Sequence, residues 1–236
     1  VALALMAALT RRGMKVQPFK VGPDFLDPLH HTATTGRTSF NLDGWMVSQE
    51  SNLNTFTEAC ADADIAIIEG VMGLFDGKET DSEQASTGEM AKWLSAPILL
   101  VVDAAGMARS IKALLQGFHL FDPHLSLTGV IFNRVHSERH FRMLTDAAKP
   151  IPSFGGIPRE KAIEIPTRHL GLVPPANGVE DPPKSKASLG TDRWAEWAES
   201  TLDIDGLLKL ARSAQTLLAS PSHRTDEMSG RRLRDD

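Results

Sequence analysis

Apolar residues follow two spacings along the first 150 positions of the chain. Short apolar runs at 65–70 and 97–103 predict strands buried on both faces, and 15–21, where apolar residues alternate with polar ones, and 127–135 are also predicted to be strands. Between them, apolar residues recur every three or four positions, which predicts helices. These predicted helices cover 1–13, 51–63, 86–94, 107–121 and 137–149. Strand and helix therefore alternate, the pattern of a parallel sheet with right-handed crossovers.

Local signals mark several boundaries of these elements. Gly13 is expected to end the first helix, in which Leu3, Met6 and Leu9 share one face. Ser86 and Glu89 have capping-box spacing at the start of another helix, so these two have a structural explanation. The polar, Gly- and Asn-rich stretch 22–45 is predicted to contain no regular element.

The pattern predicts an α/β fold of three layers, with helices on both faces of a parallel sheet. Residues 1–176 are expected to form the main domain, and 154–158 and 169–173 are short candidates for later strands. Segment 177–190 has the Pro, Lys, Ser and Gly content of a linker. An amphipathic helical segment is predicted in 191–215, within which 194–214 forms one helix, and a disordered tail in 216–236.

Composition narrows the class of protein. With 42% hydrophobic and 23% charged residues among 236, the chain has ordinary globular composition. Its net charge of -5 gives no reason to expect nucleic acid or a membrane as partner, and no apolar run is long enough to span a bilayer. The single cysteine, Cys60, excludes a disulfide framework and predicts a cytoplasmic or other reducing compartment. Cys60 itself is interpreted as a buried helix residue.

The loop after the first predicted strand, KVGPDFLDP, is unusual in its composition. Its glycine and two prolines prevent continuation of regular structure, and they leave a lysine and two aspartates at the strand end. A charged surface turn is one interpretation. The other is a shaped binding loop, because ligands of open α/β sheets bind beyond the carboxyl ends of the strands.

Polar residues follow each of the predicted strands at this same end. They are Lys20 and Asp24, Glu69 with the loop GVMGLFDG, Asp103, and Asn133 with Arg134. Lysine and glycine amides suit phosphate, and carboxylates suit Mg²⁺, so their convergence predicts a site for a magnesium-bound nucleotide. The phosphate-loop motif G-x-x-x-x-G-K-[ST] is absent from this sequence, and the chain opens inside a helix of the kind that follows such a loop. We therefore expect the phosphate loop and its strand to precede Val1.

Several runs resemble the cobyrinic acid a,c-diamide synthase family in order and spacing. They are QPFKVGPDFLDP, FNLDGWM, IEGVMGLFDG, APILLVVDAAGMARS, GVIFNRVHSERH, GIPRE and RHLGLVPP, which together span about 1–176. The family is related to dethiobiotin synthetase and has a P-loop fold. The resemblance implies amidation of the a and c acetate groups of a cobalt- or hydrogen-containing cobyrinic acid. ATP, Mg²⁺ and glutamine serve this reaction, which passes through an acyl phosphate.

The resemblance also implies roles for individual residues. Lys20 would lie near the γ-phosphate and the substrate carboxylate, with Asp24 beside it in the catalytic group. Glu69 would bind Mg²⁺ with help from Asp24 or Asp43, although Asp43 could equally cap a helix. The remaining assignments are Asn133 and Arg134 to adenine, and Gly22, Asp27, Gly73 and Arg109 to the substrate.

Other assignments stay open at this point. Arg109 and Lys112 could instead form a solvated helix face, and His30 and His31 are interpreted as surface residues more readily than as part of the site. The family's glutaminase domain is not recognisable after Pro175, so a glutaminase domain or another ammonia source would be a separate partner. A homodimer is left open.

Three alternative functions remain. One is a MinD- or ParA-like switch ATPase, which would not need a carboxylate-binding loop at KVGPDFLDP. Another is amidation of a nickel sirohydrochlorin in place of a corrinoid. The last is an inactive fragment.

Overall fold

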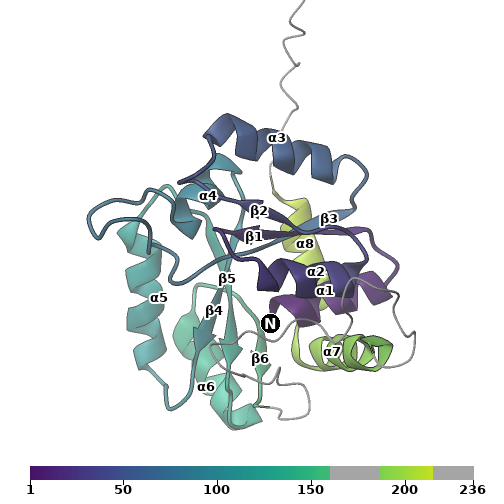
Figure 1. The fold of residues 1–236 in the computed structure, drawn as a ribbon. Coiled ribbons are helices and arrows are strands. Elements are labelled where there is room, and N and C mark those ends of the chain that lie inside the picture. The colour runs from purple at the N-terminus through teal and green to yellow at the C-terminus, as the bar shows by residue number, and fades with distance from the viewer. Residues whose placement is uncertain (160–186, 215–236) are drawn as a thin grey trace, which may run out of the picture.

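The computed structural model describes residues 1–159 and 187–214, in which strands and helices alternate (Figure 1). The strands are β1 (Val16–Val21), β2 (Phe40–Leu42), β3 (Ile65–Glu69), β4 (Ile98–Asp103), β5 (Leu127–Asn133) and β6 (Ser153–Ile157). The helices are α1 (Ala2–Arg11), α2 (Leu26–Thr35), α3 (Gln49–Cys60), α4 (Thr87–Trp93), α5 (Ser110–Phe121), α6 (Glu138–Ala148), α7 (Ala187–Thr201) and α8 (Ile204–Arg212).

All strand pairs within the sheets are parallel, which confirms the predicted α/β class. The strands form two sheets of three rather than one, in the orders β2-β1-β3 and β4-β5-β6. Figure 1 shows the first sheet running across the view and the second running down it. The carboxyl ends of the two sheets consequently point in different directions.

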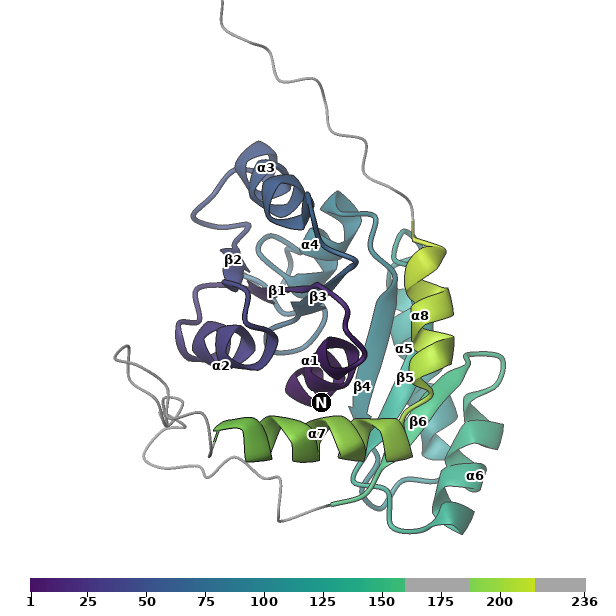
Figure 2. The same ribbon diagram turned by 90° about the vertical axis from the view of Figure 1, so that its right-hand side faces the viewer.

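Helices cover both faces of each sheet, as predicted for three layers. Helices α3 and α4 lie on one face of β2-β1-β3, and α1 and α2 lie on the other (Figures 1 and 2). In the second sheet the side chains of β5 alternate: Val130 and Phe132 pack toward α5 and α6, and Ile131 packs toward α1, α7 and α8. The core around α1 includes Val16 of the first sheet as well as Ile131 of the second, so α1 joins the two sheets.

Several local predictions are confirmed. Helix α1 ends just before Gly13, whose φ is +82°. Ser86 is the N-cap of α4 and its hydroxyl accepts a hydrogen bond from the Glu89 amide at 3.0 Å. The Glu89 carboxylate accepts in turn from the amide of Ala85 at 2.7 Å, one residue before the position expected in a capping box.

Two predictions of elements were wrong. The stretch 22–45 contains α2 and the short edge strand β2. The predicted helix 194–214 is divided into α7 and α8, because the Asp203 carboxylate accepts from the amide of Gly206 at 2.9 Å and starts a new helix. Helix α7 begins at Ala187, inside the predicted linker. The predicted strand at 169–173 and the predicted tail 216–236 lie outside the described residues.

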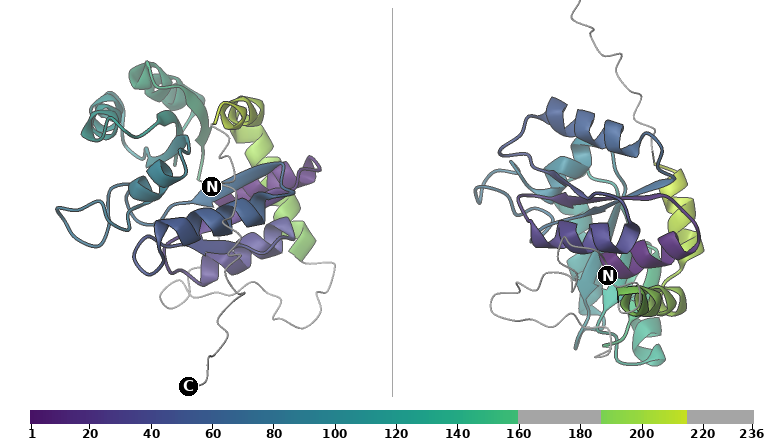
Figure 3. Two further views of the ribbon diagram at one scale, coloured as in Figure 1. Left: turned by 90° about the horizontal axis from the view of Figure 1, so that it is seen from above. Right: turned by 45° about the vertical axis from the view of Figure 1, so that its right-hand side comes forward.

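The last two helices pack on the rest of the fold: α7 lies against α1, and α8 lies against the second sheet (Figures 2 and 3). Arg12, just after α1, is paired with Glu199 of α7 and with Asp205 of α8. The late helices are therefore part of the same core as the first 150 residues.

Candidate functional site

Lys20 and Glu69 stand side by side at the carboxyl end of the first sheet. They are register partners on the neighbouring parallel strands β1 and β3, so both side chains point to the face covered by α1 and α2. The Lys20 ammonium lies 3.4 Å from Glu69 Oε2, and its side chain is only 6% exposed. This pairing confirms the expectation that the two residues share one edge.

Within KVGPDFLDP, residues 22–25 form a shaped loop between β1 and α2. Gly22 has a φ of +80°, which a residue with a side chain rarely adopts. The Asp24 carboxylate accepts the amides of Leu26 at 2.8 Å and Asp27 at 3.3 Å, an Asx turn at the start of α2. Asn41 of β2 donates to the carbonyls of Gly22 and Asp24 at 2.7 and 2.6 Å.

This loop geometry carries Asp27 to the buried lysine. Asp27 Oδ2 accepts a hydrogen bond from Lys20 Nζ at 2.5 Å, and Lys20 also donates to the Gly70 carbonyl at 3.4 Å. The lysine thus has a carboxylate from α2 and another from β3.

The surroundings of Lys20 and Glu69 favour the ionised form of each side chain. Burial disfavours the Lys20 ammonium, but the hydrogen bond to Asp27 and the charge of Glu69 outweigh it and raise the pKa of Lys20. Burial likewise opposes the Glu69 carboxylate, yet the hydrogen bond from His31 and the charge of Lys20 lower the pKa of Glu69. A cation and an anion are therefore both held at this strand end at neutral pH.

His31 belongs to the same cluster, and the interpretation as a surface residue was wrong. It is 0% exposed, with Nε2 at 2.8 Å from Glu69 Oε2 and Nδ1 at 3.2 Å from Ser39 Oγ. His31 lies four residues after Asp27, one turn along α2, so both side chains face the same strand ends. That spacing was the available signal in the sequence.

Asp43 and Gly73 have mainly local contacts. Asp43 Oδ1 accepts the amides of Trp45 and Met46 at 2.7 and 2.9 Å, so the carboxylate caps a turn after β2. The amide of Gly73 donates to Asp76 Oδ2 at 2.9 Å in the loop after β3. Their assignments to metal and to substrate stay predictions.

The predicted residues on and just after β1, β2 and β3, together with His31, are called the first group. The other predicted residues form a second group at the end of the second sheet. Asp103 and Asn133 are register partners on β4 and β5, and the Arg134 guanidinium pairs with the Asp103 carboxylate. Asn133 Oδ1 accepts the amide of Arg134, whose φ is +58°. Arg109 is the N-cap residue of α5, which follows β4. These residues lie on a different sheet from Lys20 and Glu69, and the expectation that all of them meet at one edge stays a prediction (Figure 1).

The carboxylate oxygens of the first group fit a magnesium ion that is bound together with the phosphates of a nucleotide. Within residues 1–159 and 187–214, no cluster of three or more His, Cys, Asp or Glu is placed to hold a metal ion by itself. Mg²⁺ commonly takes only one or two carboxylates and fills its other positions with water and substrate phosphate. Glu69 offers one such carboxylate.

Across the described part of the chain, no helix combines the length and apolarity needed to cross a membrane.

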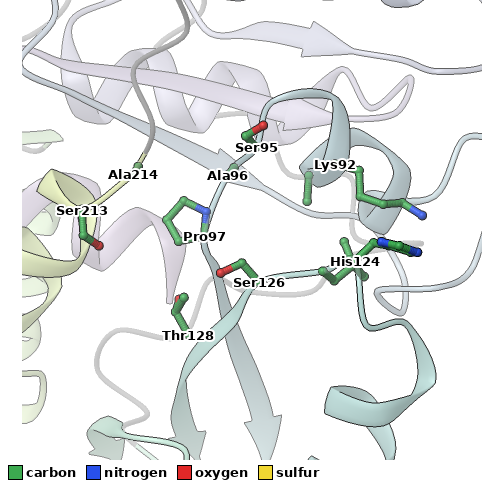
Figure 4. Close-up of a pocket in the computed structure, with 11 residues that line it drawn as sticks. Lys92, Ser95, Ala96, Pro97, His124, Ser126, Thr128, Ser213 and Ala214 are labelled. Carbon is green, nitrogen blue, oxygen red and sulfur yellow. The ribbon is translucent and has the colours of Figure 1, made fainter.

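A cavity of about 450 Å³ is lined by residues that belong to neither group. Figure 4 shows its walls. It is bounded by the end of α4, the starts of β4 and β5, and the end of α8, with Lys92, Pro97, Ser126 and Ser213 among its walls. It therefore opens at the amino ends of these strands. Lys92 is already paired with Glu83 and Asp122, so its charge is compensated within the protein.

Comparison with known proteins places these features in a family. Residues 1–173 match the model of the CobQ/CobB/MinD/ParA nucleotide binding domain. A cobyrinate a,c-diamide synthase of Leptospira interrogans (serovar copenhageni) is 44% identical over 214 residues, covering 91% of this chain and 46% of the relative. The cobyrinate a,c-diamide synthase of Syntrophotalea carbinolica is 48% identical over 212 residues, covering 89% and 45%.

A hydrogenobyrinate a,c-diamide synthase of Streptomyces coelicolor is 44% identical over 219 residues, which cover 92% of this chain and 44% of that protein. The chain thus spans just under half the length of these curated relatives. The resemblance inferred from the sequence motifs is confirmed.

Proposed function

Because the chain belongs to the CobQ/CobB/MinD/ParA nucleotide binding domain family, we propose that it binds Mg²⁺–ATP and activates the carboxylates of a corrinoid. The reaction is the ATP-dependent amidation of the a and c acetate groups of cobyrinic or hydrogenobyrinic acid. The observation that carries the proposal is the buried Lys20 ammonium between Asp27 and Glu69 at a strand end. The names of the relatives support this choice of substrate.

The chemistry needs a cation between two anions. A substrate carboxylate oxygen attacks the γ-phosphorus of ATP, the bond to ADP breaks, and an acyl phosphate forms. Ammonia then attacks the acyl carbon, phosphate leaves with the electron pair of the C–O bond, and the nitrogen loses a proton to give the amide. Lys20 has the charge to reduce the repulsion between carboxylate and γ-phosphate, and its contacts hold it in place.

The other residues of the first group would support this arrangement. Glu69 would hold Mg²⁺, which neutralises phosphate charge when bound, with Asp24 or Asp43 assisting. Asp24 would also preserve the loop through its turn, and Gly22, Asp27 and Gly73 would line the substrate side. Asn133, Arg134 and Arg109, at the second sheet, would meet adenine and substrate carboxylates.

Exposed apolar side chains favour a large, partly apolar substrate at the first sheet. Phe25, Trp45, Met46 and Met72 are 62–75% exposed and lie in the loops after β1, β2 and β3. Lys78 lies over the Trp45 ring, 5.3 Å from its centroid, and adds a positive charge. A corrinoid has an apolar ring surrounded by carboxylates, which suits this combination.

The test is an assay of the intact gene product with ATP, Mg²⁺, ammonium chloride and cobyrinic acid, so that the result does not depend on glutamine hydrolysis. We expect the a,c-diamide, with one ADP and one phosphate released for each amide formed. Hydrogenobyrinic acid and nickel sirohydrochlorin are run in parallel to define the tetrapyrrole. ATP hydrolysis that ignores every tetrapyrrole acid and yields no amide would contradict the proposal and favour a switch ATPase.

A further inference from the structure

The environment of His31 links a buried hydroxyl to the Glu69 carboxylate. Ser39 Oγ lies 3.2 Å from His31 Nδ1, and His31 Nε2 lies 2.8 Å from Glu69 Oε2. His31 is 0% exposed and Ser39 9% exposed, so water does not compete for these contacts. The three side chains come from α2, from the residue before β2, and from β3.

The chemistry of the groups determines the direction of the hydrogen bonds. An ionised carboxylate only accepts, so Nε2 must carry the proton that is donated to Glu69. The Ser39 hydroxyl can donate to Nδ1 when the ring is neutral, and it accepts when the ring is charged. In either case Nε2–H points at Glu69.

Both side chains that contact the Glu69 carboxylate do so at the same oxygen, His31 through a hydrogen bond and Lys20 through an ion pair. Lys20 Nζ lies 3.4 Å from Oε2, the atom that His31 also contacts. Over the described residues, Glu69 Oε1 accepts no hydrogen bond, and the side chain is 31% exposed. One carboxylate oxygen is thus held by the protein, and the other has no hydrogen-bond donor among the described residues.

We propose that His31 is a positioning residue, which, oriented by Ser39, holds Glu69 Oε2 so that Oε1 faces the magnesium ion of bound nucleotide. This inference rests on the proposed function, because that function assigns the metal to Glu69. Side chains that hold a ligating carboxylate or histidine commonly change metal affinity or activity 10- to 100-fold when they are replaced. Lys20 alone is a weaker constraint, because its shorter contact is to Asp27 at 2.5 Å.

Two replacements of His31 separate its two contacts. In His31→Gln the amide nitrogen occupies about the position of Nε2 and can still donate to Glu69. In His31→Asn the amide reaches only the position of Nδ1 and leaves Oε2 with Lys20 alone. We expect the Mg²⁺ concentration for half-maximal ATP binding to rise about 10- to 100-fold in His31→Asn and much less in His31→Gln.

The readout is calorimetry of ATP binding against Mg²⁺ concentration, together with nitrogen NMR of the His31 ring in the protein without nucleotide. In the wild type we expect a proton on Nε2 that exchanges slowly with water. A proton on Nδ1 only, with a bare Nε2, would overturn the proposal. So would equal Mg²⁺ requirements for the His31→Gln and His31→Asn proteins.

If the His31 variants do not fold, Ser39→Ala tests the positioning role of His31 instead. It removes one hydroxyl, and the Ser39 amide keeps its bond to Thr32 Oγ1. We expect faster exchange of the Nε2 proton and an Mg²⁺ requirement raised by about tenfold, toward the lower end of the range. The matched control is Thr34→Val, because Thr34 lies on the same helix and is 7% exposed, and its hydroxyl donates only to the His30 carbonyl. An unchanged Mg²⁺ requirement in Ser39→Ala, or an equal rise in Thr34→Val, contradicts the proposal.

These measurements remain distinct from the test of function. If the wild type binds Mg²⁺–ATP but amidates no tetrapyrrole, the proposed reaction fails while the role of His31 is still decided by Mg²⁺ dependence. A wild-type protein whose ATP binding needs no Mg²⁺ overturns both.

Discussion

Replacing Lys20 by Met tests the centre of the candidate site. Methionine has nearly the length of the lysine stem and fills the same buried space without the charge. The hydrogen bond to Asp27 joins two ionised groups, a kind that contributes about 1.5–3 kcal/mol. The Asp27 and Glu69 side chains are 42% and 31% exposed and can regain water. We therefore expect a loss of about 1–2 kcal/mol in the free energy of unfolding, less than the 3–5 kcal/mol typical of a fully buried broken pair.

The loss in free energy of unfolding caused by Lys20→Met should become smaller at acid pH. In the wild type the folded-state pKa of Glu69 lies below its ordinary value of 4.5, so its ionisation stabilises the fold above that pH. That contribution disappears as the pH falls through the lowered pKa. Burial raises the pKa of Glu69, and in Lys20→Met mainly the hydrogen bond from His31 is left to lower it. The folded-state pKa of Glu69 is therefore higher in the variant. Urea unfolding should show the full difference between wild type and Lys20→Met at pH 7, and a smaller one below about pH 4.5.

The kinetic effect should be larger than the effect on stability. Lys20 would meet charge that develops between γ-phosphate and carboxylate, so turnover should fall about 100-fold or more while ATP affinity changes little. Lys92→Met is the matched control, because Lys92 also has two carboxylate partners, Glu83 and Asp122, and lies at the cavity away from the site. It should leave turnover unchanged. Wild-type turnover in Lys20→Met would show that KVGPDFLDP is only a structural loop.

Three further predictions follow from single contacts. Gly22→Ala should lower the free energy of unfolding in urea by about 1 kcal/mol, because Gly22 has a φ of +80°; unchanged stability would contradict this. Asn133→Ala should reduce the preference for ATP over GTP in competition binding without lowering turnover at saturating nucleotide, and an unaltered preference would remove Asn133 from the adenine site. Burial raises the pKa of Cys60 to about 11 from 9.0, so iodoacetamide at pH 8 should alkylate it about 100-fold more slowly than a thiol of ordinary pKa, measured by mass spectrometry. Labelling as fast as that of a free thiol peptide would show that Cys60 is exposed.

Strands β3 and β4 could be predicted from their continuous apolar runs, although β3 is only half-buried and Val101 of β4 is exposed. The edge strand β2 could not, since it has only three residues and two of them are exposed. The position of β2 is determined by its pairing with β1, in which Lys20 lies opposite Asn41. The sequence of a single strand does not show which strand it pairs with.

The division of the strands into two sheets also could not be predicted. Alternation of strand and helix implies parallel pairing, but it does not say whether β3 and β4 pair with each other. The connection between them includes a long loop and α4, and the loop is held by Phe75, whose ring lies 5.5 Å from that of Phe118 and 4.5 Å from that of Phe121 on α5. The assumption of one sheet therefore put Asp103 and Asn133 in the same sheet as Lys20, whereas the described strands put them in a second sheet.

The error at His31 has its origin in α2. Pro28 and the turn at Gly22 indicated a loop, yet Pro28 lies in the first turn of the helix, where a missing amide donor costs little. Once α2 is recognised, the spacing of Asp27 and His31 puts both on one face, and the face must be the one that meets Lys20. A histidine assigned to a loop looks like a surface residue, and the same histidine on this helix lies against Glu69. The secondary structure of ten residues thus decides whether the site contains two carboxylates and a lysine alone, or also the side chain that orients one of them.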